Sequence, residues 1–405
     1  MELWLKEQLK FAAKYFIPSL IKYNFIAKET RELHDFRAKA GGTMRGICRP
    51  SENYELLADA GFGWVRLGIS LPPESPAEPW PDIERLQNYR DHGLKVMAIT
   101  PSVGAYLARG IDPRTPEGEE KVKALAREII TRLGDVINGV QICNEIGIPR
   151  FGRPLTMDQA VRFIGVQAQA MAPLKSGILV GYNSVGPSVD MHYKMRPWFP
   201  WIDYAGFDMY IGCFFPVLTQ LGFFEVLAKY LWAFTGKPVM LMEFGYLAGG
   251  APKSKEEKRA ILQQYGAESE REARKNIKEF VARFSEIWNN NYVERCASGD
   301  WGDFVFGPDF KQHLYRELPK NVRIRGLPHT QEGQAEFYRR LLPRLERLPF
   351  LAGLFIYCCD DDPDCCICGQ ADCPMETEWG LCTSDGTPKK GYYAVKELWG
   401  DHEIH

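Results

Sequence analysis

Short apolar runs alternate with amphipathic stretches from residue 43 to the end of the chain. The runs are rich in Val, Ile, Leu or Phe and carry few charges, which is typical of parallel strands buried on both faces. They occupy residues 43–48, 63–68, 94–100, 136–143, 176–181, 201–210, 238–244 and 351–357. Stretches with helical periodicity follow most of them, at 51–60, 82–92, 116–133, 156–172 and 331–348. Eight strand–helix repeats predict an α/β fold, a closed (β/α)8 TIM barrel.

Two parts of the chain depart from this rhythm. Residues 1–42 form an N-terminal helical extension ahead of the barrel, which we assign to 43–400. We expect the extension to pack on the barrel, and a membrane-surface helix is the alternative because aromatic residues stand among its lysines. The second part is an insertion at 246–330, in which 254–289 is charged and helical and 291–330 is irregular. It follows the seventh strand, so it shapes substrate access or is a plain surface excursion.

Two glutamates stand at the same end of the predicted barrel. Glu145 follows Asn144 after the fourth apolar run, and Glu243 ends the seventh. Catalytic groups of such barrels come from the C-terminal ends of the strands. Two carboxyl groups about 5–5.5 Å apart suit double displacement at an anomeric carbon, because one protonates the leaving group while the other attacks. Each glutamate alone could be a capping or salt-bridging group, and only the pair indicates catalysis.

The residues around these glutamates resemble clan A of the glycoside hydrolases, the group that includes families 1 and 5. The resemblance covers roughly residues 43–398 and rests on Asn144-Glu145, Glu243 in LMEFGY, Arg66 in WVRLGIS, Tyr210 in DYAGFDMY, residues 334–361 and the closing WGLCTSDGTPKKGYYAVKEL. It implies that Glu145 is the general acid/base and Glu243 the nucleophile. It further implies that Asn144 binds the sugar 2-hydroxyl, and that Arg66 and Tyr210 contact the nucleophile. A structural ion pair for Arg66 and rim packing for Tyr210 are the alternatives.

Three further residues are candidates for contact with the sugar. Tyr357 ends the eighth run where the clan usually has Trp, which predicts a smaller or differently tilted stacking platform. Asp208 stands where family 1 usually has Asn, and it could hydrogen-bond sugar hydroxyls. Trp379 lies in the predicted eighth loop, and aromatic faces stack well on the apolar faces of sugars.

Cysteines gather near the C-terminus, where residues 358–382 hold seven of the eleven in the chain. The set that could hold a structural zinc comprises Cys365, Cys366, Cys368 and Cys373. Reduced unpaired thiols and disulfides are the alternatives. Catalysis by the clan needs no metal, so we expect no cofactor in the reaction itself.

Charge and hydropathy limit the partners. The formal net charge is −2, which makes nucleic acid an unexpected partner. Charged residues interrupt the apolar N-terminus, and no run of 18 apolar residues occurs, so we expect a cytoplasmic protein without a membrane span. A carbohydrate is the expected partner.

The sequence thus predicts a hydrolase of carbohydrate metabolism. We expect a retaining glycosidase that cleaves β-glycosidic bonds, with exo-action on small β-glycosides or oligosaccharides. Transglycosylation at the same site is one alternative. A non-catalytic carbohydrate-binding barrel and a zinc-dependent hydrolase using the cysteine-rich loop are the others.

Overall fold

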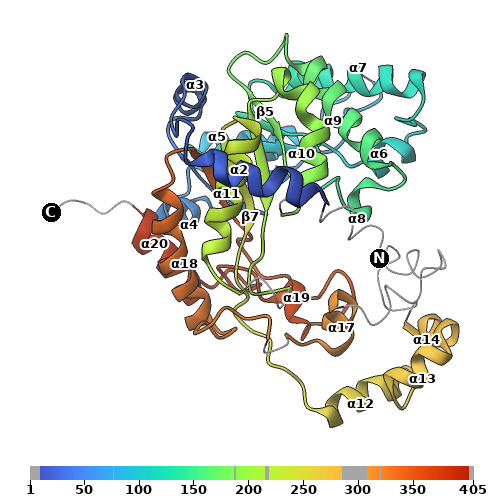
Figure 1. Cartoon of the computed structure of the whole chain (residues 1–405). Coiled ribbons are helices and arrows are strands. Elements are labelled where there is room, and N and C mark those ends of the chain that lie inside the picture. Colours follow the sequence, from blue (N-terminus) through green and yellow to red (C-terminus); the bar gives the residue numbers. More distant parts are fainter. Residues whose placement is uncertain are drawn as a thin grey trace.

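A closed barrel of eight parallel strands forms the centre of the protein, which confirms the predicted (β/α)8 fold (Figure 1). The computed structural model describes residues 10–75, 77–186, 188–214, 219–284, 308–318 and 321–400. Each strand pairs with its sequence neighbours, and β8 closes the barrel against β1. The strands are β1 Met44–Cys48, β2 Trp64–Gly68, β3 Lys95–Ile99, β4 Gly139–Gln141, β5 Leu179–Tyr182, β6 Tyr204–Asp208, β7 Val239–Phe244 and β8 Leu351–Ile356.

Helices cover the outer face of the strands. The main ones are α4 Tyr54–Asp59, α5 Ile83–Asp91, α7 Pro116–Leu133, α9 Met157–Met171, α11 Gly222–Thr235, α18 Gln331–Glu346 and α20 Lys390–Trp399. Shorter helices lie between them: α6 Val103–Ala108, α8 Pro149–Gly152, α10 Val189–Met195, the 3₁₀ helix η2 Arg196–Trp201 and α19 Pro374–Thr377. Side-chain caps set several starts, because Thr115, Thr156 and Thr330 each accept a backbone N–H of the first turn.

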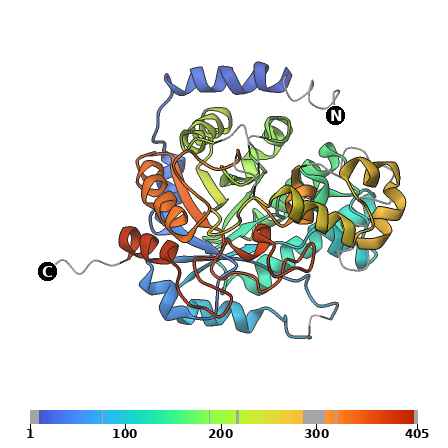
Figure 2. The same cartoon turned by 90° about the horizontal axis from the view of Figure 1, so that it is seen from below.

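The N-terminal extension packs against the barrel from two sides. The π-helix η1 Ala12–Phe16 and α2 Ile17–Tyr23 lie along the outside of the helical ring (Figure 2), where Phe16 contacts Tyr230 of α11. Helix α3 Arg31–Ala40 lies at the opposite end from the loops that follow the strands. There Arg37 donates hydrogen bonds to the carbonyls of Pro349 and Leu351 at the start of β8.

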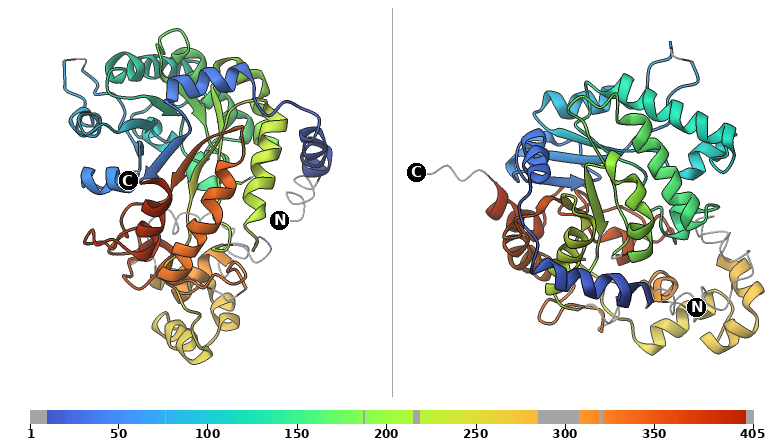
Figure 3. Two further views of the ribbon diagram at one scale, coloured as in Figure 1. Left: turned by 90° about the vertical axis from the view of Figure 1, so that its left-hand side faces the viewer. Right: turned by 45° about the horizontal axis from the view of Figure 1, so that its top comes forward.

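The insertion after β7 forms a helical excursion. Its described helices are α12 Lys255–Gln264, α13 Glu270–Lys275, α14 Ile277–Phe284 and α17 Pro308–Tyr315; residues 285–307 and 319–320 of the predicted insertion lie outside the described part. The first three project away from the barrel (Figure 3). Helix α17 falls in a stretch that the sequence predicts to be irregular, and it begins with Pro, whose fixed φ suits a first helical position. Among the described helices, none has the length and apolar character needed to span a membrane.

Candidate active site

The side chain of Glu243 is held by two donors at the C-terminal end of β7. The residue is 8% exposed. Arg66 of β2 donates from Nη1 to Oε1 at 2.7 Å, and the Tyr210 hydroxyl donates to Oε2 at 2.6 Å. Burial raises the pKa of Tyr210 well above its ordinary value, and the charge of Glu243 adds to the shift. The hydroxyl therefore stays protonated around neutral pH and donates a hydrogen bond to the carboxylate.

Asn144 is oriented by a network that also includes Arg66. Its Oδ1 accepts from Arg66 Nη2 at 2.7 Å, from Asn183 Nδ2 at 2.9 Å and from Gln141 Nε2 at 3.2 Å. Gln141 in turn accepts from Arg66 Nε at 2.7 Å. Because three donors hold the amide oxygen, the nitrogen is the group that Asn144 can offer to a hydroxyl of a ligand.

Glu145 lies on a constrained loop beyond the end of β4. The predicted strand extends to residue 143, whereas β4 ends at Gln141. Cys143 and Glu145 then adopt positive φ values of 56° and 44°, which non-glycine residues rarely do. The Glu145 N–H donates to Asn183 Oδ1 at 2.9 Å, which helps to hold this conformation. Strain of this kind persists where the surroundings over-determine it, and it clusters at active sites.

Three carboxyl groups converge at this mouth of the barrel. Oxygen atoms of Glu145, Asp208 and Glu243 all lie within 4.8 Å of one another. A register shift in the pairing of β6 with β7 sets Asp208 opposite Glu243. Burial raises the pKa of Asp208 well above its ordinary value, and the negative charges of Glu243 and Glu145 raise it further. These three effects outweigh the nearby Arg66 guanidinium, so the surroundings of Asp208 favour its protonated form, and its side chain hydrogen-bonds Glu145.

Aromatic rings pack around Tyr210, the residue that donates to Glu243. The Tyr210 ring meets Tyr357 edge-on at 5.8 Å between centroids, and it meets Trp379 at 4.8 Å. Trp379 is only 2% exposed, and its indole N–H donates to the Met375 carbonyl at 2.6 Å. The sequence predicts a sugar-contacting role for Trp379; in the structure its ring is covered and packs against Tyr210. Tyr357 is part-exposed, and its hydroxyl accepts from Arg49 at 3.3 Å.

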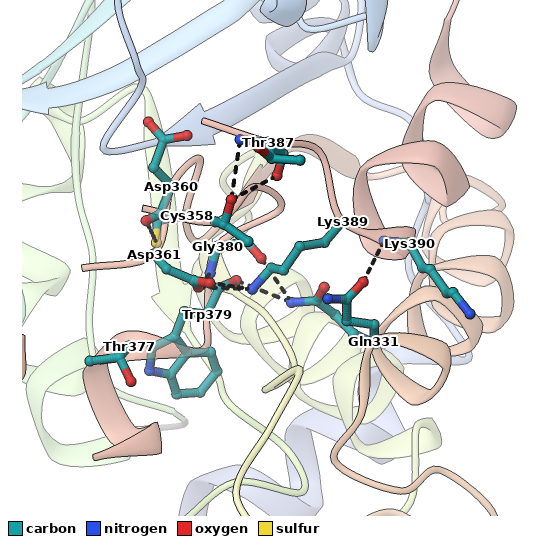
Figure 4. Close-up of polar contacts among 12 residues, drawn as sticks. Gln331, Cys358, Asp360, Asp361, Thr377, Trp379, Gly380, Thr387, Lys389 and Lys390 are labelled. Atoms are coloured by element: carbon teal, nitrogen blue, oxygen red, sulfur yellow. Dashed lines mark hydrogen bonds and ion pairs between the residues drawn. The ribbon is translucent and has the colours of Figure 1, made fainter. Parts of the chain in front are cut away.

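A buried ion pair holds the loop that carries Trp379, residues 357–389, which we call the βα8 loop (Figure 4). Lys389 donates to both carboxylate oxygens of Asp361, at 2.8 and 2.7 Å. The N–H of Gly380 donates to the same carboxylate at 2.7 Å. Residues 358–361 and 379–389 are thereby joined, which positions Trp379 behind Tyr210.

Sequence patterns missed two polar residues of the site. Asn183 links Asn144, Glu145 and Asp208, and it follows the end of β5 just as the predicted residues follow their strands. Gln141 is a buried amide inside an apolar run, which marks a polar group that needs a partner. Both signals were present in the sequence.

The cysteine-rich part of the βα8 loop differs from the prediction. Cys365, Cys368 and Cys373 lie together, whereas Cys366 is exposed and outside the group. His313 of α17 supplies the fourth side chain instead. None of the ten cysteines in the described part of the chain forms a disulfide.

Solved structures share the barrel. No family model and no curated protein matches the sequence. A GH2 β-galacturonidase from Eisenbergiella tayi is 14% identical, with a TM-score of 0.50 over 88% of this chain and 50% of its own. A family 39 glycoside hydrolase from Bacteroides cellulosilyticus WH2 is 14% identical, with a TM-score of 0.52 over 87% and 62%. Parabacteroides merdae β-glucuronidase is 12% identical, with a TM-score of 0.54 over 89% and 38%. These likenesses show a common fold, and the chain spans less than two thirds of each of these proteins.

Proposed function

We propose that this protein is a retaining glycoside hydrolase that cleaves β-glycosidic bonds. The observation that carries the proposal is the approach of Glu145 and Glu243, whose carboxyl oxygens lie within 4.8 Å. Retaining enzymes have carboxyl groups about 5–5.5 Å apart, whereas inverting enzymes need about 6.5–9.5 Å to admit a water. The structural neighbours are named as a β-galacturonidase, a β-glucuronidase and a family 39 glycoside hydrolase, which is consistent with a β-glycoside as substrate.

Each step of double displacement has a residue suited to it. Glu243 attacks the anomeric carbon, and Arg66 holds the attacking carboxylate through an ion pair at 2.7 Å. The hydrogen bond from Tyr210 orients the attacking carboxylate. Glu145 gives its proton to the departing oxygen and then takes a proton from the water that hydrolyses the glycosyl-enzyme. Asn144 would bind the 2-hydroxyl beside Glu243 through its amide nitrogen.

The third carboxyl group suits a role in proton placement. In its protonated form, which burial and the two neighbouring carboxyl groups favour, Asp208 presents one donor and one acceptor. Its hydrogen bond to Glu145 tunes the acid/base without adding a second buried negative charge. We expect exo-action on small β-glycosides, because the insertion after β7 and the βα8 loop both border the site.

The decisive experiment measures turnover and stereochemistry together. A panel of aryl β-glycosides should include glucosides, galactosides, glucuronides and galacturonides. We expect at least one to be hydrolysed, with the β-anomer as the first product seen by NMR. Glu243→Ala should lose most of this activity, and azide should partly restore it by forming an α-glycosyl azide.

Other outcomes separate the alternatives. An α-anomer as first product would contradict the retaining mechanism. Sugar binding without turnover on the whole panel would favour a non-catalytic barrel, and transfer products with an added acceptor would favour a transglycosylase. Loss of turnover on strong chelation, with the fold intact, would favour a zinc-dependent hydrolase. Release of short oligosaccharides from the interior of a polymer would contradict exo-action.

A further inference from the structure

Four potential metal ligands meet away from the carboxylate site, where the insertion contacts the βα8 loop. This cysteine–histidine cluster consists of His313 on α17 and Cys365, Cys368 and Cys373 on the loop. All four side chains are buried, and their ligand atoms lie within 4.8 Å of one another. The His313 Nδ1 atom is 3.5 Å from Cys365 Sγ and 3.4 Å from Cys373 Sγ.

These distances fit one tetrahedral ion. Zinc binds cysteine sulfur at about 2.3 Å and histidine nitrogen at about 2.0–2.1 Å, so a tetrahedral site sets sulfur and nitrogen about 3.5 Å apart. Three thiolates and one imidazole are a common ligand set for structural zinc, which leaves no open position for a substrate. A [4Fe–4S] cluster would separate its ligands further, because each ligand binds a different iron.

The local fold of the loop holds two of the cysteines close together. Cys365-Cys366-Ile367-Cys368 forms a tight turn in which the Ile367 N–H donates to Cys365 Sγ at 3.4 Å. Gly369 follows with a φ of 65°, a conformation that glycine adopts readily. The turn thus brings Cys365 and Cys368 to the same side of the loop, and a backbone donor holds the sulfur of Cys365 in place.

We propose that the cysteine–histidine cluster binds one structural zinc ion that fastens the insertion to the wall of the active site. Cys373 directly precedes α19, and Trp379 follows α19 and packs on Tyr210. Helices α17 and α19 lie side by side in Figures 1 and 3. Just beyond the end of α17, Arg316 forms an ion pair at 3.0 Å with Asp372, which precedes Cys373. The ion therefore joins segments 52 residues apart in sequence and steadies the aromatic side of the site.

Metal analysis of the full-length protein, purified under reducing conditions, tests the proposal directly. We expect about one zinc per chain in the wild type and in Cys366→Ser, whose exposed side chain adjoins the cluster without belonging to it. His313→Ala and Cys373→Ser should lose the metal, with affinity falling by more than about 100-fold. Substitution of Co²⁺ should give the visible spectrum of a tetrahedral site and a sulfur-to-metal band that Cys366→Ser keeps.

A variant that exchanges one ligand for another guards against misfolding as the cause of metal loss. His313→Cys should restore stoichiometric metal at a site of four thiolates, with a Co²⁺ spectrum shifted from that of the wild type. Proteolysis should cut the insertion faster in His313→Ala than in His313→Cys. Wild-type protein without bound metal that also fails to take up Zn²⁺ or Co²⁺ when reduced would overturn the proposal. Equal metal loss in Cys366→Ser would overturn the assignment of ligands.

Discussion

Two buried ion pairs in this protein are alike in exposure and different in surroundings. In Arg66–Glu243 and in Lys389–Asp361 alike, the side chain of the cation is 2% exposed and that of the carboxylate 10%. Asp361 has a lysine that contacts both its oxygens and a backbone N–H besides. The Arg66 guanidinium that pairs with Glu243 also donates to the side-chain amides of Gln141 and Asn144.

The difference lies in how charge is balanced around each pair. Burial raises the pKa of Asp361, and Lys389 opposes the shift as a dedicated partner. Around Glu243, two more carboxyl groups crowd one cation, and the pKa of Asp208 is raised well above its ordinary value by burial and by both neighbours. In the Lys389–Asp361 pair, which holds the βα8 loop, the two charges balance each other. A site that moves protons keeps carboxyl groups whose environments differ.

The largest effect is expected at the acid/base. Glu145→Gln cannot donate or accept the catalytic proton, so kcat/KM should fall by about 10²–10⁴-fold on substrates with a poor leaving group. Aryl groups that leave easily need little protonation, so the loss in the glycosylation step should be much smaller for them. Steady-state kinetics with a nitrophenyl and an alkyl glycoside measure the contrast. An equal loss of kcat/KM on both would contradict the role of Glu145.

Removing the cation of the Lys389–Asp361 pair should mainly lower the stability of the fold. Lys389→Met leaves Asp361 buried without its cation, which should cost about 3–5 kcal/mol in the free energy of unfolding. Urea denaturation measures this loss, and kcat of the protein that remains folded should fall far less than it does in Glu145→Gln. Adding Asp361→Leu should recover most of the stability, because an apolar pair of similar volume avoids the unpaired charge. No recovery in the double variant would contradict this account.

A smaller effect is expected from removing one hydrogen bond to the nucleophile. Tyr210→Phe deletes a donor to a charged carboxylate, worth about 1.5–3 kcal/mol, so kcat/KM should fall by about 10- to 100-fold. Tyr246→Phe is the matched control, because its buried hydroxyl donates to the Leu327 carbonyl at 2.6 Å. That variant should lose about 1 kcal/mol of stability and keep its kcat. Similar kinetics in the two variants would contradict a specific role for Tyr210.

The smallest effect concerns the pH dependence of stability. The folded-state pKa of Asp208 lies above the ordinary 3.8, so the folded protein binds its proton more tightly than the unfolded chain does. The contribution of Asp208 to stability is complete below about pH 4 and is lost as the pH rises towards the folded-state pKa. Asp208→Asn does not titrate, so it should gain stability relative to the wild type as the pH rises above about 4. Urea denaturation at several pH values tests this, and a difference that does not vary with pH would contradict it.

The barrel and its central residues follow from local features of the sequence. Apolar runs of strand length that alternate with amphipathic stretches leave few folds other than a parallel barrel. Residues late in such runs or just after them then lie towards one end of it, which brings Glu145 near Glu243 and both near Arg66 and Tyr210. Asn183 follows the same logic, and it could have been predicted from its place after β5.

Other features depend on contacts between distant parts of the chain. Trp379 is buried behind Tyr210 because the Lys389–Asp361 pair folds the βα8 loop inward, and no local pattern encodes that direction. His313 replaces the exposed Cys366 in the cysteine–histidine cluster because α17 packs on the loop from 52 residues away. Strand periodicity is a local property, so the sequence by itself predicts the order of the strands and the end of the barrel where the carboxyl groups gather. Which side chains are covered and which charges go unbalanced depends on the folded chain, because burial and electrostatics sum over neighbours that are remote in sequence.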